Sequence, residues 1–388
     1  MSSDKLSTYL IDPLAPIIVR SGRPFDAQYG LDAARFPPPS TLAGALRTAH
    51  ADSNALALGA HLAELEVRGP LPLKQPTDGR AATLLVPKPA DAHYLWDSEN
   101  NEQVVAATPS ELSDGEGMDL PEGLLPLQLE RKCKGKPTHG PHWWSLADFL
   151  AFRAGTFMSH KSICANGWTP PADDLRTHVA IDPNTQANER GKFFQTAGLS
   201  FSVPTRSKSP LGQEKLPEQS VALLGQIAGA INAGVITLGG ERRLAAIESV
   251  ADTLWPAEPA GWIDEAITGK RISLTLLTPA LFRAGWRPAW LDAQLQGSPP
   301  GCEGLVLKLR AAAVERWQPH SGWDLAARKP RAGRKLVPAG AVYWFEILES
   351  TVKALSSLWL RSICDDKQDC LDGFGLALPC AWQSPANF

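Results

Sequence analysis

Three consecutive prolines at positions 37–39 constrain this chain more than any other feature, because they decide where a helix can begin. A proline disfavours helical geometry in the residue before it, so the chain should reach Ser40 in an extended conformation. Ser40 stands where an N-cap residue is needed, with a hydroxyl that can accept from a free amide. Leu42 and Leu46 follow four residues apart on one helical face. The pattern predicts a helix with a sharp start at Ser40.

The start of such a helix offers free backbone amides and the positive end of a dipole, which suits a phosphate or another anion. Four arginines lie near it in the sequence: Arg20, Arg23, Arg35 and Arg47. The stretch 20–49 therefore has two interpretations. It is a capped core helix with solvated arginines, or it is an anion clamp.

The composition is that of a globular protein with a large core. The chain has 388 residues, 44% hydrophobic and 20% charged, which favours two domains. The formal net charge of −3 disfavours a general nucleic-acid or membrane binder, although a basic groove on a neutral protein remains compatible with it. No apolar run reaches the roughly 18 residues of a membrane span, and the N-terminus does not resemble a secretory signal.

The sequence contains no motif of a cofactor or metal site. None of the six cysteines forms a CxxC pair, which points to free thiols in a reducing cytoplasm. His139 and His142 lack a matching set of metal ligands. There is no P-loop, no Rossmann glycine pattern, no HExxH and no GxSxG. We therefore predict no cofactor, no metal and a cytoplasmic location.

The middle of the chain predicts a long hairpin followed by a domain boundary. Residues 178–203 alternate strand-like segments around turn residues, and Asn188, Arg190 and Lys192 make the tip polar and basic. Residues 205–217 are polar and contain prolines, so we place the boundary there, with domains 1–215 and 216–388. Residues 219–231 have the apolar pattern of a helix.

Several loops stand out by charge. Residues 97–123 are acidic and polar, which predicts an exposed insertion. Residues 131–136 are basic and precede two tryptophans, a composition typical of single-stranded RNA contacts or of a solvated lysine loop. The densest basic run is 328–335, which is either a solvated loop or a nucleic-acid patch. A turn with two glycines and two arginines spans 239–243.

Separate stretches of the chain resemble the CRISPR-associated RAMP proteins, in the order expected for that family. They are IDPLAPIIVRSGRPFDA, FPPPSTLAGALR, HVAIDPNTQANERGKFF, LGGERRLA, LTPALF, VPAGAVYWFE and DGFGLALP. Within this family, the chain looks more like the Cas5-like group of type III-B (Cmr) effector complexes, whose members cap the 5′ end of the guide RNA.

This resemblance implies an α+β fold with two ferredoxin-like (RRM-like) RAMP domains, a protruding β-hairpin or thumb, and loop insertions. It implies a non-catalytic subunit for antiviral defence that binds the 5′ repeat-derived tag of the crRNA. The expected partners are the large polymerase-type subunit and the backbone RAMP subunit, with target RNA nearby and no membrane.

The resemblance also implies where RNA is bound. The family's opening loop and helix correspond here to Arg20, Gly22, Arg23 and Pro24 and to Thr41, Gly44 and Arg47. The hairpin corresponds to Asp182, Thr185, Arg190 and Phe194, and the glycine-rich loop to Gly373 and Gly375. Together with the basic turns and loops, the predicted RNA contacts are Arg20, Arg23, Thr41, Arg47, Asn188, Arg190, Lys192, Arg242, Arg243, Arg328, Lys329, Arg331, Gly373 and Gly375.

Two other functions remain open from the sequence. A RAMP endoribonuclease that processes repeat RNA would use a histidine as acid and base, and His50, just past the predicted helix, is the candidate. An assembly protein with little RNA contact would fit the low net charge and the 13 tryptophans.

Overall fold

The computed structural model describes residues 5–19, 33–76, 81–97, 99, 101–131, 133, 136–202, 219–324 and 329–382, and only the backbone of 189–194, 219, 323–324 and 329–330. The chain forms two compact units that alternate along the sequence. Unit 1 comprises Met1–Thr83, Pro170–Leu254 and Pro319–Arg334; unit 2 comprises Leu84–Thr169, Trp255–Gln318 and Lys335–Phe388.

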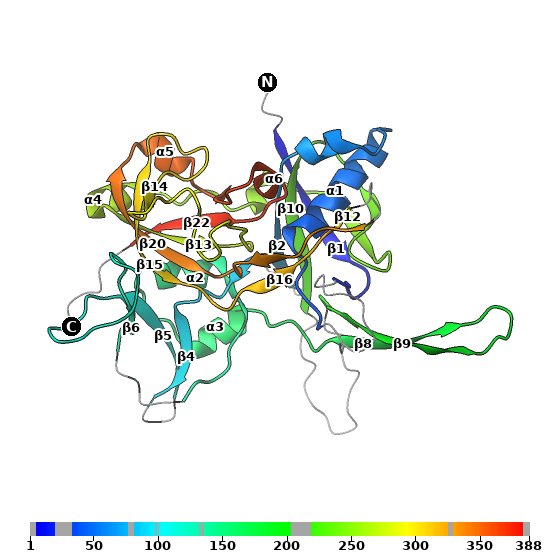
Figure 1. Cartoon of the computed structure of the whole chain (residues 1–388), viewed down its shortest axis with the longest axis horizontal. Helices are drawn as coiled ribbons and strands as arrows, with labels where there is room; N and C mark the ends of the chain where they lie inside the picture. Colours follow the sequence, from blue (N-terminus) through cyan, green and yellow to red (C-terminus); the bar gives the residue numbers. More distant parts are fainter. Residues whose placement is uncertain are drawn as a thin grey trace. The chain divides into compact units, whose positions relative to one another are not determined.

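Unit 1 contains a helix on an antiparallel sheet and a long separate hairpin (Figure 1). Its elements are β1 (Leu6–Pro13), α1 (Pro39–Ser53), η1 (Ala60–Glu64), β2 (Val67–Pro76), β8 (Asp174–Ile181), β9 (Asn188–Gly198), β10 (Gln219–Ala228), β11 (Gly234–Thr237), β12 (Leu244–Ser249), η2 (Asp252–Leu254), β17 (Trp323–Asp324) and β18 (Lys329–Pro330). The short strands β16 (Gln318–His320) and β19 (Arg334–Leu336) each cross a unit boundary along the chain.

The sheet of unit 1 runs in the order β11-β12-β1-β10-β2, with every neighbouring pair antiparallel. Helix α1 packs on the face that carries Tyr9 and Gly225, because Leu42 and Leu46 reach the position where a Gly225 side chain would stand. Leu42 and Leu46 are both fully buried. The apolar face read from the sequence is therefore the face by which α1 covers the sheet.

Unit 2 contains a six-stranded sheet and a smaller three-stranded one. Its elements are β3 (Thr83–Pro87), β4 (Ala92–Trp96), β5 (Glu102–Pro109), β6 (Leu127–Leu129), β7 (Trp143–Ser145), α2 (Leu146–Arg153), α3 (His160–Asn166), α4 (Trp262–Gly269), β13 (Arg271–Leu276), β14 (Gln296–Gly297), β15 (Val306–Ala313), β20 (Val342–Glu349), α5 (Val352–Ser356), β21 (Arg361–Ser362), α6 (Lys367–Leu371) and β22 (Leu376–Ala381).

The large sheet of unit 2 has the order β14-β15-β20-β13-β22-β21 and the small one β4-β5-β6, both antiparallel. Aromatic residues of β20 fill the core, where Tyr343 and Phe345 are fully buried and stack at 6.4 Å between ring centroids. Helices α4 and α5 contribute Ala266 and Leu355 to the same core. The chain is thus an α+β protein built on antiparallel sheets, as expected; the ferredoxin-like arrangement stays a prediction.

The predicted helix start is corrected by two positions. Helix α1 begins at Pro39, and its N-cap is Pro38 in extended geometry, with no side-chain cap. Proline is favoured at the first helical position, because its missing N–H would have no partner there and its φ angle already suits a helix. Ser40 is therefore inside the helix and does not cap it.

The predicted helix over 219–231 is wrong, because this segment forms strand β10 between β1 and β2. Val221, Ala222, Leu223 and Leu224 are all fully buried, so both faces of the strand are covered. A short run that is apolar on both faces cannot be assigned to helix or strand by its period alone. Strand β10 pairs with β1 and β2, which lie on the other side of the predicted boundary. The two compact units therefore differ from the predicted domains 1–215 and 216–388.

The predicted insertion over 97–123 is partly structured. Residues 102–109 form β5, with Val104 and Val105 buried, and pair with β4 and β6. Residues 110–123 are mostly exposed, as expected. In the part of the chain that the structure describes, no helix is long and apolar enough to cross a membrane.

Candidate RNA interface

The segment Ile17–Ile18 lies between two other parts of unit 1. On one side, Ile17 and Leu199 exchange backbone hydrogen bonds of 2.9 and 2.8 Å, so the segment is pinned to the base of the β8–β9 hairpin. On the other side, the Gly240 amide donates to the Ile18 carbonyl at 2.7 Å. Three stretches that are far apart in sequence therefore meet at the entrance to the loop that begins with Arg20.

The turn between β11 and β12 is the stretch with two glycines and two arginines. Gly239, Glu241 and Arg242 all have positive φ angles of 82°, 56° and 51°. Such geometry is easy for glycine and uncommon for other residues, and it turns the chain tightly against Ile18. Arg242 is exposed at the turn, whereas Arg243 is half-buried. The buried Nε atom of Arg243 has no hydrogen-bond partner among the described residues.

The β8–β9 hairpin extends away from the sheet of unit 1 (Figure 1). Its tip is closed by Asp182, whose Oδ1 atom accepts from the amides of Asn184 and Thr185 at 2.7 and 3.4 Å. Such side-chain acceptance is the usual reason for aspartate in a turn. Asn188 is exposed and pairs with Ile181 in the ladder.

The predicted contacts Arg190 and Lys192 lie in strand β9, which begins at Asn188. The structure does not describe their side chains. On the opposite strand, Leu175, Val179 and Ile181 are 55%, 46% and 51% exposed. The hairpin therefore presents apolar side chains to solvent along β8.

The far end of the opening loop returns to the same region. The Ala34 amide donates to the Asp173 carboxylate at 2.9 Å, and Asp173 directly precedes β8. Two residues on, Phe36 contacts Phe201, with ring centroids 6.1 Å apart. The described residues on both sides of positions 20–32 thus contact the hairpin base, while Arg20 and Arg23 lie outside the described residues.

Helix α1 holds the other predicted contacts of this segment. Thr41 is half-buried in the first turn. The Arg47 guanidinium donates from Nε and Nη2 to the Leu65 carbonyl at 3.2 and 2.8 Å, so it ties α1 to the chain before β2. His50, the candidate for catalysis, lies with Nδ1 2.9 Å from the Ala230 carbonyl.

The basic stretch 328–335 is partly described. Arg328 lies outside the described residues, and Lys329 is a backbone position of β18. Arg331 is exposed, and its amide donates to the Gly322 carbonyl at 2.8 Å. Arg35, near the opening loop, donates to the Pro319 carbonyl at 3.1 Å, which connects this stretch to the others within unit 1.

Gly373 and Gly375 belong to unit 2, where both are buried. The Thr278 hydroxyl donates to the Gly373 carbonyl at 2.8 Å, and the Gly375 amide donates to the Pro279 carbonyl at 2.8 Å. A Cβ added at Gly375 would stand 2.6 Å from the Cys364 sulfur. This loop is shaped by close packing inside unit 2, and its part in RNA binding stays a prediction.

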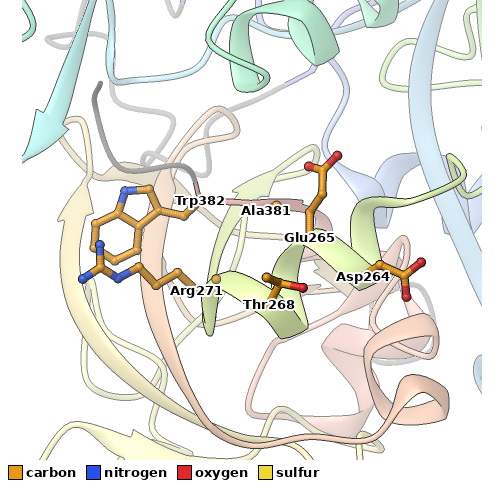
Figure 2. Close-up of a pocket in the computed structure, with 7 residues that line it drawn as sticks. Asp264, Glu265, Thr268, Arg271, Ala381 and Trp382 are labelled. Carbon is orange, nitrogen blue, oxygen red and sulfur yellow. The ribbon is translucent and has the colours of Figure 1, made fainter. Parts of the chain in front are cut away.

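A separate open pocket of about 700 Å³ lies in unit 2 (Figure 2). The Arg271 guanidinium stacks 5.0 Å from the Trp382 ring centroid on one side, and Asp264 and Glu265 of α4 line the other. None of the predicted RNA contacts lines this pocket. Its carboxylates would repel a phosphate, so the pocket does not fit the predicted ligand.

Sequence reasoning missed the residues that hold this junction of unit 1 together. Ile17, Leu199 and Gly240 act through backbone atoms, for which no residue type is diagnostic. Asp173 and Phe36 are visible in the sequence as a carboxylate just before a strand and an aromatic ring just before three prolines. Both side chains have partners in the fold. Their partners could not be identified without the fold.

Comparisons with known proteins gave one family match and several similar solved structures. The model of the family described as CRISPR-associated protein (Cas_Cmr3) matches residues 9–382. Among solved structures, the chain is similar to one in a type III-B Cmr-beta complex bound to cognate target RNA, with 16% identity, a TM-score of 0.46, and 87% of this chain and 86% of that chain covered.

A second similar structure is a type III-B Cmr-beta complex bound to cognate target RNA and AMPPnP, state 1. The identity is 14% and the TM-score 0.45, with 87% of this chain and 86% of that chain covered. A search of curated proteins gave no match.

Proposed function

The chain belongs to the Cas_Cmr3 family of CRISPR-associated proteins, the Cas5-like subunit of the type III-B Cmr effector complex, and from this premise we propose that it caps the 5′ repeat-derived tag of the guide RNA. It does so as a non-catalytic subunit that binds RNA and connects the large polymerase-type subunit to the backbone RAMP subunit.

The observation that carries this proposal is the position of Ile17–Ile18 between Leu199 and Gly240. It brings the segment before the predicted opening loop, the hairpin base and the Arg242–Arg243 turn to one place in unit 1. Arginine side chains at such a junction suit the phosphates of a single strand. Contacts of this kind set the position of the strand and carry little sequence information.

The exposed Arg242 supports the same interpretation. Its side chain is open to solvent, so a phosphate oxygen can reach the guanidinium and accept from it. The net charge of −3 is a total for the whole chain, so it is compatible with a local basic site.

The β8–β9 hairpin has a separate role in the proposal. Its exposed Leu175, Val179 and Ile181 give it an apolar surface that can insert between bases and unstack them. A hairpin placed where the tag meets the guide would divide the two regions. Target RNA paired to the guide would then lie near the hairpin.

A gel shift with the full chain at fixed salt tests the proposal. One RNA carries the repeat-derived tag at its 5′ end, and a second has the tag scrambled. Tighter binding of the first RNA is expected. Arg242→Ala should weaken binding, and repeating the titration at several salt concentrations should show a slope of log affinity against log salt that is smaller by about 0.7 for each phosphate that the variant no longer neutralises.

Arg316→Ala is the matched control, because Arg316 is an exposed arginine that belongs to unit 2 and is not among the predicted RNA contacts. It should bind both RNAs like the unmodified chain. Equal binding of tagged and scrambled RNA, with no effect of Arg242→Ala, would contradict the proposal.

A further inference from the structure

Strand β11 is an open edge of the unit 1 sheet. It pairs with β12 on one side, and no described strand pairs with its other side. Its sequence, Gly-Val-Ile-Thr, has no charge and no proline, and its ladder with β12 is regular. Natural proteins usually protect an edge strand with charges, prolines or bulges, because an open edge pairs with other chains. β11 has none of these three features; the shortness of the strand, which has 4 residues, is its only such protection among the described residues.

The register shows which backbone groups of β11 face outward. Leu238 donates to the Arg243 carbonyl, so Leu238 occupies a hydrogen-bonded position, and Ile236 and Gly234 follow at alternate residues. The backbone groups of Val235 and Thr237 therefore point away from β12. Two residues with outward N–H and C=O groups are available to an added strand.

Three apolar side chains are exposed beside this edge. Leu14, Val235 and Leu244 are 58%, 61% and 48% exposed. The Leu14 amide donates to the Leu244 carbonyl at 3.0 Å, and Leu244 is paired with Thr237. Residues opposite each other or two apart in a sheet share a face, so the three side chains form one patch.

The same face carries two carboxylates. Asp12 is paired with Ala246, two residues before Glu248 on the neighbouring strand. Burial, and then the Glu248 carboxylate, raise the pKa of Asp12. Acidic groups here repel RNA phosphates and would be neutralised by a basic side chain. The face therefore fits an apolar and basic protein segment and does not fit RNA.

The edge is held rigidly before any partner arrives. The Ile231 amide donates to the Tyr9 hydroxyl at 2.8 Å, and the Asn232 amide donates to the Ser53 hydroxyl at 3.0 Å. The chain entering β11 is thereby fixed to β1 and to the end of α1. A pre-ordered edge lowers the entropic cost of adding a strand.

We propose that β11 and the face carrying Leu14, Leu244, Asp12 and Glu248 bind an extended segment of another protein subunit by strand addition. The segment has apolar side chains at alternate positions and a lysine or arginine directed at the two carboxylates. The inference rests on the proposed function, because it takes its partner from the effector complex. A second copy of the chain fits less well, because the β11 strand that it would add has no basic side chain to face the two carboxylates.

The test uses the full chain, tagged and co-expressed with the other subunits of its complex. Val235→Glu puts a charge into the patch, and Thr237→Pro removes one outward N–H without altering the ladder with β12. Leu58→Glu is the matched control, an equally exposed leucine of unit 1 that is 66% exposed in the loop after α1. Thermal unfolding of each purified variant establishes that it is folded.

The expected result is that both β11 variants lose one identified protein subunit on co-purification, with affinity for it about tenfold lower. Leu58→Glu should keep that subunit, and all three should bind tagged RNA normally in the gel shift. A photo-crosslinker at Val235 should react with an extended segment of the lost subunit that contains Lys or Arg.

Complete complexes from both folded β11 variants would overturn the proposal. So would a crosslink from Val235 to RNA or to a second copy of the chain. Tagged-RNA binding is measured separately, so the two proposals can fail independently. Equal binding of tagged and scrambled RNA would contradict the RNA function, and complete complexes from the β11 variants would contradict strand addition.

Discussion

Gly239 lies directly against Ile18: a Cβ atom added at Gly239 would stand 2.8 Å from the Ile18 carbonyl oxygen. Gly239 also has a φ angle of 82°, which side-chain-bearing residues rarely adopt. These two facts show why the arginine-containing turn begins with glycines. The turn must approach the opening segment more closely than any other residue allows.

Gly239→Ala should therefore destabilise unit 1 by about 1–3 kcal/mol and weaken tagged-RNA binding, because the turn must move away from Ile18. Denaturant unfolding and the gel shift measure the two effects. Gly234→Ala in the same hairpin is the control, since nothing lies within 4 Å of its added Cβ. It should change stability by less than about 0.5 kcal/mol. Equal stability of both variants would show that the close approach is not needed.

Breaking the buried ion pair of Asp91 and Arg153 should destabilise unit 2 strongly. Two hydrogen bonds of 2.7 Å join the side chains, which are only 3% and 8% exposed. Asp91→Ala leaves a buried guanidinium unpaired and should cost about 3–5 kcal/mol in denaturant unfolding.

The control for this pair is Glu346→Gln. Glu346 lies 3.5 Å from Arg310, but its side chain is 44% exposed, so water screens the pair. The expected cost is below about 1 kcal/mol. If the two substitutions had similar effects, burial would not be the deciding factor.

Asp12→Asn should stabilise the free chain at neutral pH. The pKa of Asp12 is raised above its usual 3.8 by burial and then by Glu248, so the folded state holds the proton more tightly than the unfolded state. Stability therefore falls as the pH rises from 3.8 through the raised pKa. Thermal unfolding across pH should show the gain at neutral pH and none at pH values well below 3.8.

Asp252 gives the opposite sign and serves as the comparison. Hydrogen bonds from Lys5 and Thr8 lower the pKa of this exposed carboxyl below 3.8, so its contribution is present above that value and lost as the pH falls through the lowered pKa. Asp252→Asn should destabilise at neutral pH. A stabilising effect of this substitution would contradict the assigned contacts.

His50→Ala should lower stability by about 1 kcal/mol and leave the handling of RNA unchanged. Its ring nitrogen is bound to the Ala230 carbonyl, and an added Cβ at Gly229 would stand 2.7 Å from that ring. The residue thus joins α1 to the chain before β11. Incubation with labelled repeat RNA checks this: site-specific cleavage that His50→Ala abolishes would favour an endoribonuclease.

Replacing Val179 and Ile181 with serine should change the base stacking of the bound RNA and leave the folding of the protein unchanged. Both side chains are about half exposed on the β8–β9 hairpin, so the expected loss of stability is below about 0.5 kcal/mol. In the assembled complex, 2-aminopurine at the first guide nucleotide should become less fluorescent, because it would no longer be unstacked. Leu56→Ser, at a leucine 44% exposed near α1, is the control.

Local pattern was sufficient for some features of the fold. Leu42 and Leu46 identified the buried face of α1, and the turn residues around Asp182 identified the β8–β9 hairpin. These features depend on neighbours within a few residues, which the sequence states directly. The order of the motifs also identified the family, which the match over residues 9–382 confirms.

Other features were decided only by tertiary structure. Residues 219–228 became a strand because β1 and β2 cover both of its edges, while a run of buried apolar residues has no period of its own. Likewise Ile17, Leu199 and Gly240 meet through backbone hydrogen bonds, although they are far apart along the chain. Backbone groups are the same in every residue, so only the assembled fold of unit 1 could select these partners.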